Sequence, residues 1–195
     1  VPTQSEGATN RILTADEELD QLVGLGSVKR TIKKIRAFAK KNKVDSNFNL
    51  HMCFYGNPGT GKTEVARILS RLLYDAGVLS EAKLVETDST GLLGKYVGET
   101  APKTKDKIND AMGGVLFIDE AYALMGSKAS GGSSTNYGEE AIAVLLKEME
   151  DNRGKFCVIL AGYKQEMNKL ISVNPGFQSR IQFTLDFPDY TREEL

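Results

Sequence analysis

The 195 residues of the chain suit one domain with a substantial buried core. Apolar residues make up 41% and charged residues 26%, which is ordinary globular composition, and a formal net charge of −1 gives no sign of nucleic-acid binding. No apolar run approaches the length of a membrane span, and no secretory signal pattern is present. We therefore expect a cytoplasmic protein that binds neither nucleic acid nor membrane.

The first elements predicted along the chain are helical. Residues 1–13 are polar and are predicted to be loose, and Thr14 is placed to cap a short helix together with Glu17 three residues later. A basic helix follows, with apolar side chains at helical spacing among its lysines and arginines. We interpret these cations as a solvated face, with an acidic partner as the alternative.

The most informative segment is residues 56–63, with the sequence Gly-Asn-Pro-Gly-Thr-Gly-Lys-Thr. An apolar run at 50–55 predicts a buried strand before it, and apolar residues at helical spacing predict a helix after it. The segment matches the phosphate-binding loop G-x-x-x-x-G-K-[ST] at every constrained position. The alternative, a glycine-rich hairpin turn, would leave the strand and the helix unexplained.

This loop predicts a site for ATP or ADP with Mg²⁺. Its glycines let backbone N–H groups at a helix N-terminus approach phosphate oxygens closely. Lys62 would add a solvent-facing catalytic charge for the β- and γ-phosphates, and Thr63 would offer a hydroxyl to Mg²⁺. The nucleotide contacts predicted here are Asn57, Pro58, Gly59, Thr60, Gly61, Lys62, Thr63 and Glu64.

Strands alternate with helices along the rest of the chain. Apolar runs predict strands at 84–88, 114–120, 156–161 and 181–185, and amphipathic patterns predict helices at 99–112 and 139–150. A Ser- and Gly-rich stretch at 128–138 predicts an exposed loop. The alternation indicates an α/β fold, with a five-stranded parallel sheet flanked by helices on both faces.

Both cysteines, Cys53 and Cys157, fall within predicted strands. We expect buried, reduced thiols there, rather than a disulfide or a metal site. The single histidine, His51, has no companion ligands and starts a strand, so we expect a packed or edge histidine.

An acidic pair, Asp119 and Glu120, ends the third predicted strand. The carboxyl ends of strands in an open α/β sheet face the crevice in which ligands bind. Asp119 can therefore complete a Mg²⁺ site opposite Thr63, and Glu120 can orient and deprotonate an attacking water. Acidic residues also end strands because turns are polar, but the apolar run before this pair and the phosphate loop upstream favour the catalytic interpretation.

Three further segments accompany the phosphate loop: Gly-Lys-Tyr-Val-Gly-Glu-Thr at 94–100, Leu-Phe-Ile-Asp-Glu at 116–120 and Asn-Pro-Gly-Phe-Gln-Ser-Arg at 174–180. Together they resemble the AAA+ ATPases, and more narrowly the CbxX/CfqX family, which includes red-type Rubisco activases and the sporulation protein SpoVK. The resemblance covers residues 22–188. It implies a P-loop NTPase core of the AAA+ type and ATP hydrolysis that drives the remodelling of a protein client.

The resemblance also implies roles for individual residues. The residues of a central-pore loop that grips a polypeptide client would be Lys95, Tyr96 and Val97. Arg180 would be a catalytic arginine finger, offered to the ATP of a neighbouring subunit. Val23 and Gly24 would pass near the adenine. The full-length protein would then act as a homo-hexameric ring.

Three features depart from the pattern of the family. Tyr163 stands where most AAA+ proteins place a polar sensor residue, and Gln178 replaces an arginine often found two residues before the finger. The resemblance also implies a small helical lid after the core, most of which we expect to be missing from this sequence. We therefore divide the chain into a loose segment at 1–13, a large α/β ATPase subdomain at 14–190 and the beginning of a helical lid at 191–195. This fragment is expected to be monomeric.

Other classes of protein fit the sequence less well than an ATPase. A GTPase would read guanine with a motif like Asn-Lys-Val-Asp at 42–45, but that motif lies upstream of the phosphate loop instead of on a later strand end. A small-molecule kinase would need an acceptor pocket that no segment predicts. A scaffold that binds nucleotide without hydrolysis would have no use for Glu120. The sequence favours an ATPase and does not identify its client.

Overall fold

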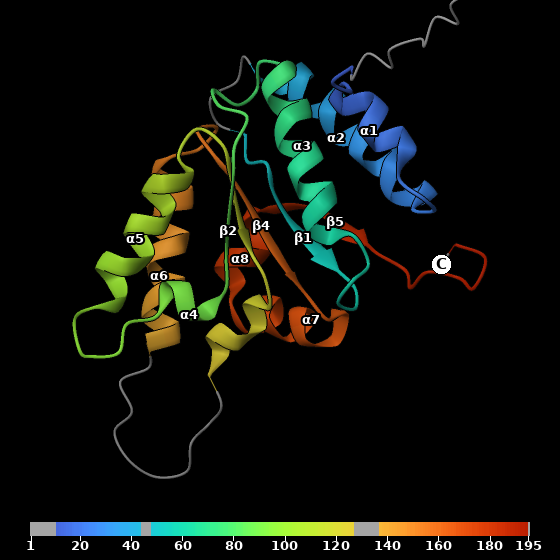
Figure 1. Ribbon diagram of the computed structural model, residues 1–195. Coiled ribbons are helices and arrows are strands. Elements are labelled where there is room, and N and C mark those ends of the chain that lie inside the picture. Colours follow the sequence, from blue (N-terminus) through green and yellow to red (C-terminus); the bar gives the residue numbers. More distant parts are fainter. Residues whose placement is uncertain (1–10, 44–47, 127–136, 195) are drawn as a thin grey trace, which may run out of the picture.

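Five parallel strands form the centre of the molecule, with helices on both faces of the sheet (Figure 1). The computed structural model describes residues 11–43, 48–126 and 137–194. In spatial order the strands are β2 (Leu84–Thr87), β3 (Val115–Ile118), β4 (Cys157–Gly162), β1 (His51–Tyr55) and β5 (Ile181–Asp186). All neighbouring strands pair in parallel, which confirms the predicted α/β fold with a five-stranded sheet.

The helices complete two separate apolar cores, one on each face of the sheet. One core includes α1 (Ala15–Gln21), α2 (Gly26–Asn42) and α3 (Lys62–Asp75). The other includes α4 (Ser89–Leu92), α5 (Thr100–Ala111), the 3₁₀ helix η1 (Ala121–Met125), α6 (Tyr137–Asp151), α7 (Lys164–Val173) and α8 (Pro175–Arg180). Successive side chains of a strand point to opposite faces, so Phe54 belongs to the first core and Cys53 to the second.

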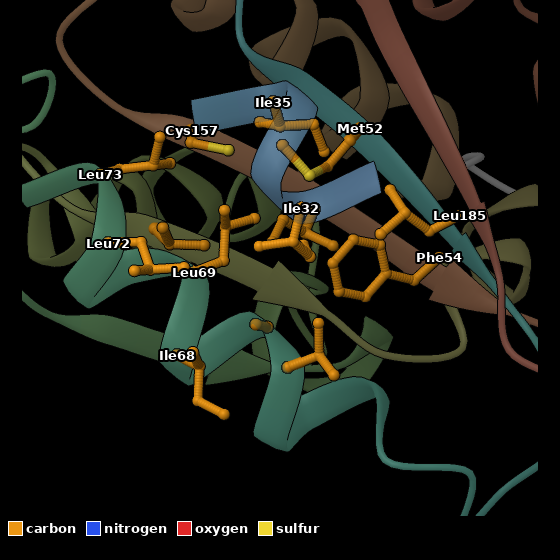
Figure 2. Packing of buried hydrophobic residues seen from close by; sticks show 14 of the residues in the cluster. Ile32, Ile35, Met52, Phe54, Ile68, Leu69, Leu72, Leu73, Cys157 and Leu185 are labelled. Carbon is orange, nitrogen blue, oxygen red and sulfur yellow. The ribbon is translucent and has the colours of Figure 1, made fainter. Parts of the chain in front are cut away.

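The first core fixes the helix that follows the phosphate loop. Side chains of α2 and α3 pack on β1, and Figure 2 shows their contact surface: Ile32, Ile35, Met52, Phe54, Leu69, Leu72 and Leu73. None of these side chains is more than 2% exposed. Burying each stabilises the fold by about 1.5–3 kcal/mol. The packing therefore holds α3 at a fixed angle to β1, and with it the connecting loop at 56–61.

Local structure follows most of the predictions and departs from them at the end of the third strand and at the start of α6. Thr14 and Glu17 form the expected reciprocal cap of α1. The third strand ends at Ile118, so the acidic pair follows it instead of belonging to it. Helix α6 begins at Tyr137, two residues before its predicted start. Residues 1–10 of the predicted loose segment at 1–13 and residues 128–136 of the predicted loop at 128–138 lie outside the described residues.

The described end of the chain forms a turn. Residues 191–194, where the sequence predicts the beginning of a helical lid, form a single turn. The N–H of Glu194 donates to the carbonyl of Thr191 at 3.1 Å, and the N–H of Thr191 donates to the Glu194 carboxylate at 2.9 Å. The carboxylate thus closes the turn on itself, and no further helical hydrogen bond follows within the described residues.

Both cysteines are buried and free, as predicted. They belong to opposite cores, since Cys53 packs on one face of the sheet and Cys157 on the other. Burial raises the pKa of Cys53 to about 12 and also raises the pKa of Cys157. Both thiols therefore stay protonated near neutral pH and act as small apolar side chains.

His51 is packed inside the sheet, between β4 and β5. Its Nδ1 accepts the N–H of Val158 at 2.9 Å, and its Nε2 has no hydrogen-bond partner among the described residues. Burial, together with the charge of Arg180, lowers the pKa of His51 from 6.5 to about 3. The imidazole is therefore neutral in the folded protein and becomes protonated first in the unfolded chain.

This pKa difference predicts a loss of stability on acidification. Between pH 6.5 and about 3 the unfolded chain binds one more proton at His51 than the folded chain, so the free energy of unfolding falls as the pH falls. The slope should be about 1.4 kcal/mol per pH unit larger than in His51→Gln, which cannot be protonated in this range. Urea unfolding at several pH values measures both slopes. Equal slopes in the two proteins would contradict the assignment.

Candidate functional site

The carboxyl ends of β1, β3 and β4 meet at one edge of the sheet and surround a cavity of about 450 Å³. This is the edge at which open α/β sheets bind ligands. The residues around the cavity come from the phosphate loop, the first turns of α3, the ends of β3 and β4, and the segment after β5. They are Gly56, Pro58, Gly59, Thr60, Gly61, Lys62, Thr63, Glu64, Arg67, Asp119, Glu120, Gly162, Tyr163 and Tyr190.

The backbone of the loop is shaped to receive an anion. Gly59 and Gly61 have φ of +76° and +89°, values that favour glycine. Gly61 caps α3 without a side-chain hydrogen bond, so the first N–H groups of this 14-residue helix keep no capping side chain as partner. Free N–H groups and the positive end of a helix dipole together fit phosphate oxygens.

Lys62 is folded back onto the loop. Its Nζ donates to the carbonyl oxygens of Gly56 at 2.6 Å and Asn57 at 2.8 Å, and the residue is only 8% exposed. The expectation of a solvent-facing lysine was therefore wrong, because the loop carbonyls draw the ammonium group inward. Burial lowers the pKa of Lys62, while the carboxylates of Asp119 and Glu120 act in the opposite direction.

The acidic pair lies where β3 ends against β2. The N–H of Asp119 donates to the carbonyl of Thr87 at 2.8 Å, and an Asp119 carboxylate oxygen accepts the N–H of Glu120 at 2.9 Å. Glu120 adopts a left-handed conformation with φ of 48°, which is unusual for a residue other than glycine. Backbone strain of this kind costs about 1–3 kcal/mol and clusters at functional sites. This backbone conformation follows the end of β3, and the Glu120 side chain lines the cavity.

The oxygen atoms around the cavity fit Mg²⁺ better than they fit a metal ion whose ligands all come from the protein. Among the described residues, no group of three or more His, Cys, Asp or Glu side chains could hold a metal ion. The cavity offers instead one hydroxyl, from Thr63, and one carboxylate, from Asp119. Mg²⁺ is commonly bound in this way, through one or two protein oxygens, with water and phosphate oxygens completing the shell.

Asn57, Val23 and Gly24 lie away from the cavity lining. The Asn57 amide donates to both carboxylate oxygens of Asp189, at 2.9 and 3.1 Å, which ties the loop to the segment after β5. Val23 lies in the bend between α1 and α2 and is 57% exposed, and Gly24 lies against the carboxylate of Glu194. The structure therefore does not place these three predicted contacts among the residues that line the cavity.

Three cavity residues were missed in the sequence: Arg67, Gly162 and Tyr190. Arg67 lies one helical turn after Thr63, so its spacing could have identified it; it pairs with Glu64 at 2.8 Å. Tyr190 lies more than a hundred residues from the loop, and no spacing rule connects the two. Tyr163, which stands at the position of the usual polar sensor, also lines the cavity. The centre of its ring lies 6.0 Å from that of Tyr122.

Arg180 lies at the opposite edge of the sheet. It precedes β5, whose first residue pairs with His51 at the start of β1, while the phosphate loop follows the end of β1. Five residues at about 3.3 Å each separate the two edges by roughly 17 Å. The Arg180 guanidinium donates to the Gly176 carbonyl at 3.0 Å and pairs with Glu150 at 3.3 Å. Arg180 therefore does not belong to the cavity of its own chain.

The predicted pore loop lies between α4 and α5 (Figure 1). None of Lys95, Tyr96 and Val97 lines the cavity. Tyr96 is 70% and Val97 77% exposed. The described part of the Asn-Lys-Val-Asp motif, Asn42 and Lys43, is far from the cavity as well. Lys43 approaches Gly77, beyond the C-terminus of α3, whereas the phosphate loop lies before its N-terminus, and Val44 and Asp45 are outside the described residues. This placement removes the support for a guanine-reading role.

None of the described helices is both long enough and apolar enough to cross a membrane.

Comparison with known proteins agrees with this arrangement. The profile of the family described as ATPase family associated with various cellular activities (AAA) matches residues 52–189. The chain is 46% identical over 187 residues to stage V sporulation protein K of Bacillus subtilis, which covers 92% of this chain and 56% of that protein. It is 44% identical over 198 residues to the chromosomal protein CbxX of Cupriavidus necator, covering 98% and 60%.

A third relative is the chloroplastic ribulose bisphosphate carboxylase/oxygenase activase of Cyanidioschyzon merolae, 42% identical over 203 residues, covering 100% of this chain and 68% of that protein. The chain thus spans 56% to 60% of the length of the first two relatives. The phosphate loop, the acidic pair and these matches agree with one another. The chain belongs to the AAA ATPase family, and within it to the CbxX/CfqX type.

Proposed function

We propose that the chain is the motor core of a cytoplasmic ring that hydrolyses Mg²⁺–ATP to ADP and phosphate and uses this energy to remodel a protein client. One observation carries the proposal: Lys62, Thr63, Asp119 and Glu120 line one cavity at the carboxyl edge of the sheet. Membership of the AAA family supports ATP hydrolysis as the reaction.

Binding would begin with an exchange of partners at Lys62. Its Nζ, held by two loop carbonyls, would turn to the β- and γ-phosphate oxygens, which carry more negative charge. Thr63 and Asp119 would hold Mg²⁺, which would supply positive charge that stabilises the phosphates. The free N–H groups at the start of α3 would complete the contacts to the phosphates.

Glu120 would act as the general base. Its side chain is exposed at the cavity, so a carboxylate oxygen has room to accept a proton from a water molecule that attacks the γ-phosphate. Asp119 cannot take this role equally well, since one of its oxygens already accepts the N–H of Glu120 and the same group would hold Mg²⁺.

Arg180 would complete the site of a neighbouring copy. Because it lies at the far edge of the sheet from its own phosphate loop, its charge can assist hydrolysis only in another subunit. This requirement supports a closed homo-oligomer, for which we propose a hexamer. A finger of this type stabilises negative charge that develops on the transferred phosphoryl group.

The client would be gripped by Tyr96 and Val97, with Lys95 beside them. Their large, exposed apolar side chains are typical of a surface that binds a partner. One relative carries a name that describes the activation of another protein, ribulose bisphosphate carboxylase/oxygenase, which supports a protein as the client here. No nucleic acid enters this account.

The nucleotide assignment is tested by removing the charge of Lys62. Lys62→Met keeps the buried stem and removes the ammonium group, so the fold should remain while the affinity for Mg²⁺–ATP falls about 100-fold, as expected for lost charge-assisted hydrogen bonds. Titration calorimetry measures the affinity, and thermal unfolding checks the fold. Lys62→Ala, which also removes the stem, should lose binding to the same extent. Unchanged ATP affinity in the Met variant would refute the site.

A further inference from the structure

One carboxylate oxygen holds the loop between α4 and α5. The Oε2 atom of Glu99 accepts the N–H of Lys95 at 2.9 Å and the N–H of Tyr96 at 3.1 Å, while the N–H of Glu99 donates to the carbonyl of Tyr96 at 3.3 Å. Glu99 also caps the N-terminus of α5, yet its side chain makes no hydrogen bond to that helix. The carboxylate thus serves the loop instead of the helix that begins beside it.

The base of the same loop is fixed by neighbouring contacts. The N–H of Gly94 donates to the hydroxyl of Thr100 at 2.9 Å, and Thr100 is fully buried. A side chain at Gly94 would lie 2.4 Å from Cβ of Glu99, so the backbone closes tightly here. The ammonium group of Lys103 donates hydrogen bonds to the carbonyls of Thr90 and Leu93, at 2.8 and 2.9 Å. These bonds anchor the end of α4 to α5.

This bracing has a consequence for the two side chains at the tip. Tyr96 is 70% and Val97 77% exposed, although burial of either side chain would be favourable. A loop without a fixed shape could fold these side chains back against its own domain. With the N–H groups of Lys95 and Tyr96 held by Glu99, the loop keeps both apolar side chains in solvent.

We propose that Glu99 is a positioning residue, whose carboxylate presents Tyr96 and Val97 to an extended polypeptide segment with apolar side chains. That the ligand is a polypeptide rests on the proposed remodelling function. The role of Glu99 in bracing the loop does not depend on that function. Neither Tyr96 nor Val97 lines the nucleotide cavity. Glu99 therefore acts on the grip of the client and not on the phosphates.

Amide hydrogen exchange measured by NMR tests the bracing directly in this chain. In Glu99→Ala the N–H groups of Lys95 and Tyr96 lose their acceptor and should exchange about tenfold faster. Glu99→Gln keeps an acceptor oxygen and should restore most of the protection. The N–H of Gly91, held by the carboxylate of Asp88 at 3.1 Å, is the internal reference and should not change. Unchanged exchange at Lys95 and Tyr96 in Glu99→Ala would overturn the proposal.

Binding of an unfolded polypeptide tests the consequence. The probe is fluorescently labelled, reduced and carboxymethylated α-lactalbumin, added to the full-length protein. Glu99→Ala should weaken binding about tenfold, Glu99→Gln should stay within about threefold of wild type, and Tyr96→Ala should abolish binding. Loss in Tyr96→Ala with no change in Glu99→Ala would overturn the positioning role. Failure of the wild-type protein to bind the probe would overturn the polypeptide grip, and amide exchange would still decide whether Glu99 braces the loop.

Discussion

Replacing Arg180 with Ala is expected to lower the steady-state rate of ATP hydrolysis by about 1,000- to 100,000-fold in the assembled full-length protein, because arginine fingers contribute this much in related phosphoryl transfers. Affinity for ATP should change much less than the rate, because an arginine finger acts mainly on negative charge that develops in the transition state. A coupled assay for released phosphate measures the rate. Light scattering verifies that the variant still assembles.

Arg153→Ala is the matched control. Arg153 pairs with the same Glu150 carboxylate as Arg180, at 2.5 Å, and is likewise partly buried. Its removal tests whether disturbing this cluster of charges is enough to stop hydrolysis. We expect a rate within a few-fold of wild type. A loss as large as that of Arg180→Ala would point to a structural role of the cluster and would count against a catalytic Arg180.

Replacing Glu120 with Gln is expected to slow hydrolysis by about 100- to 10,000-fold, the usual cost of losing a positioned general base. The variant keeps the size and hydrogen-bonding capacity of the side chain, so ATP should still bind. Single-turnover hydrolysis with bound ATP separates this loss from any change in affinity.

Glu86→Gln provides the control for this substitution. Glu86 is an exposed acid near the end of β2, which borders a neighbouring hollow together with Glu120 but does not line the nucleotide cavity. Removing its charge should leave the rate almost unchanged. If Glu120→Gln turned over ATP within a few-fold of wild type, Glu120 would not be the base, and a nucleotide-binding scaffold would become the better account.

Much of the fold could be predicted because strong local signals were sufficient. The strands read as apolar runs, since both faces of a parallel sheet are buried, and the phosphate loop carries constraints on nearly every position. Four helices of the described residues were not predicted: α4, η1, α7 and α8. The shortest of them hold too few residues for a periodic pattern, and tertiary packing decides their conformation.

The site could be predicted only where it is local in sequence. Lys62, Thr63, Asp119 and Glu120 lie in or beside recognisable segments, and all four line one cavity. The burial of Lys62 could not be predicted, since it depends on which carbonyls the folded loop presents. The contribution of Tyr190 depends on the path of the chain after β5.

The most direct test of the central claim, that ATP is hydrolysed at sites shared between copies of this chain, mixes two inactive full-length proteins. Arg180→Ala subunits keep Glu120, and Glu120→Gln subunits keep Arg180. In rings mixed at random from equal amounts of the two variants, roughly a quarter of the sites should combine an intact Glu120 with an intact Arg180 from the neighbour, and hydrolysis should return in that proportion. If Arg180 served the site of its own chain, every site would lack one of the two groups. Verified mixed rings without recovered hydrolysis would contradict the account.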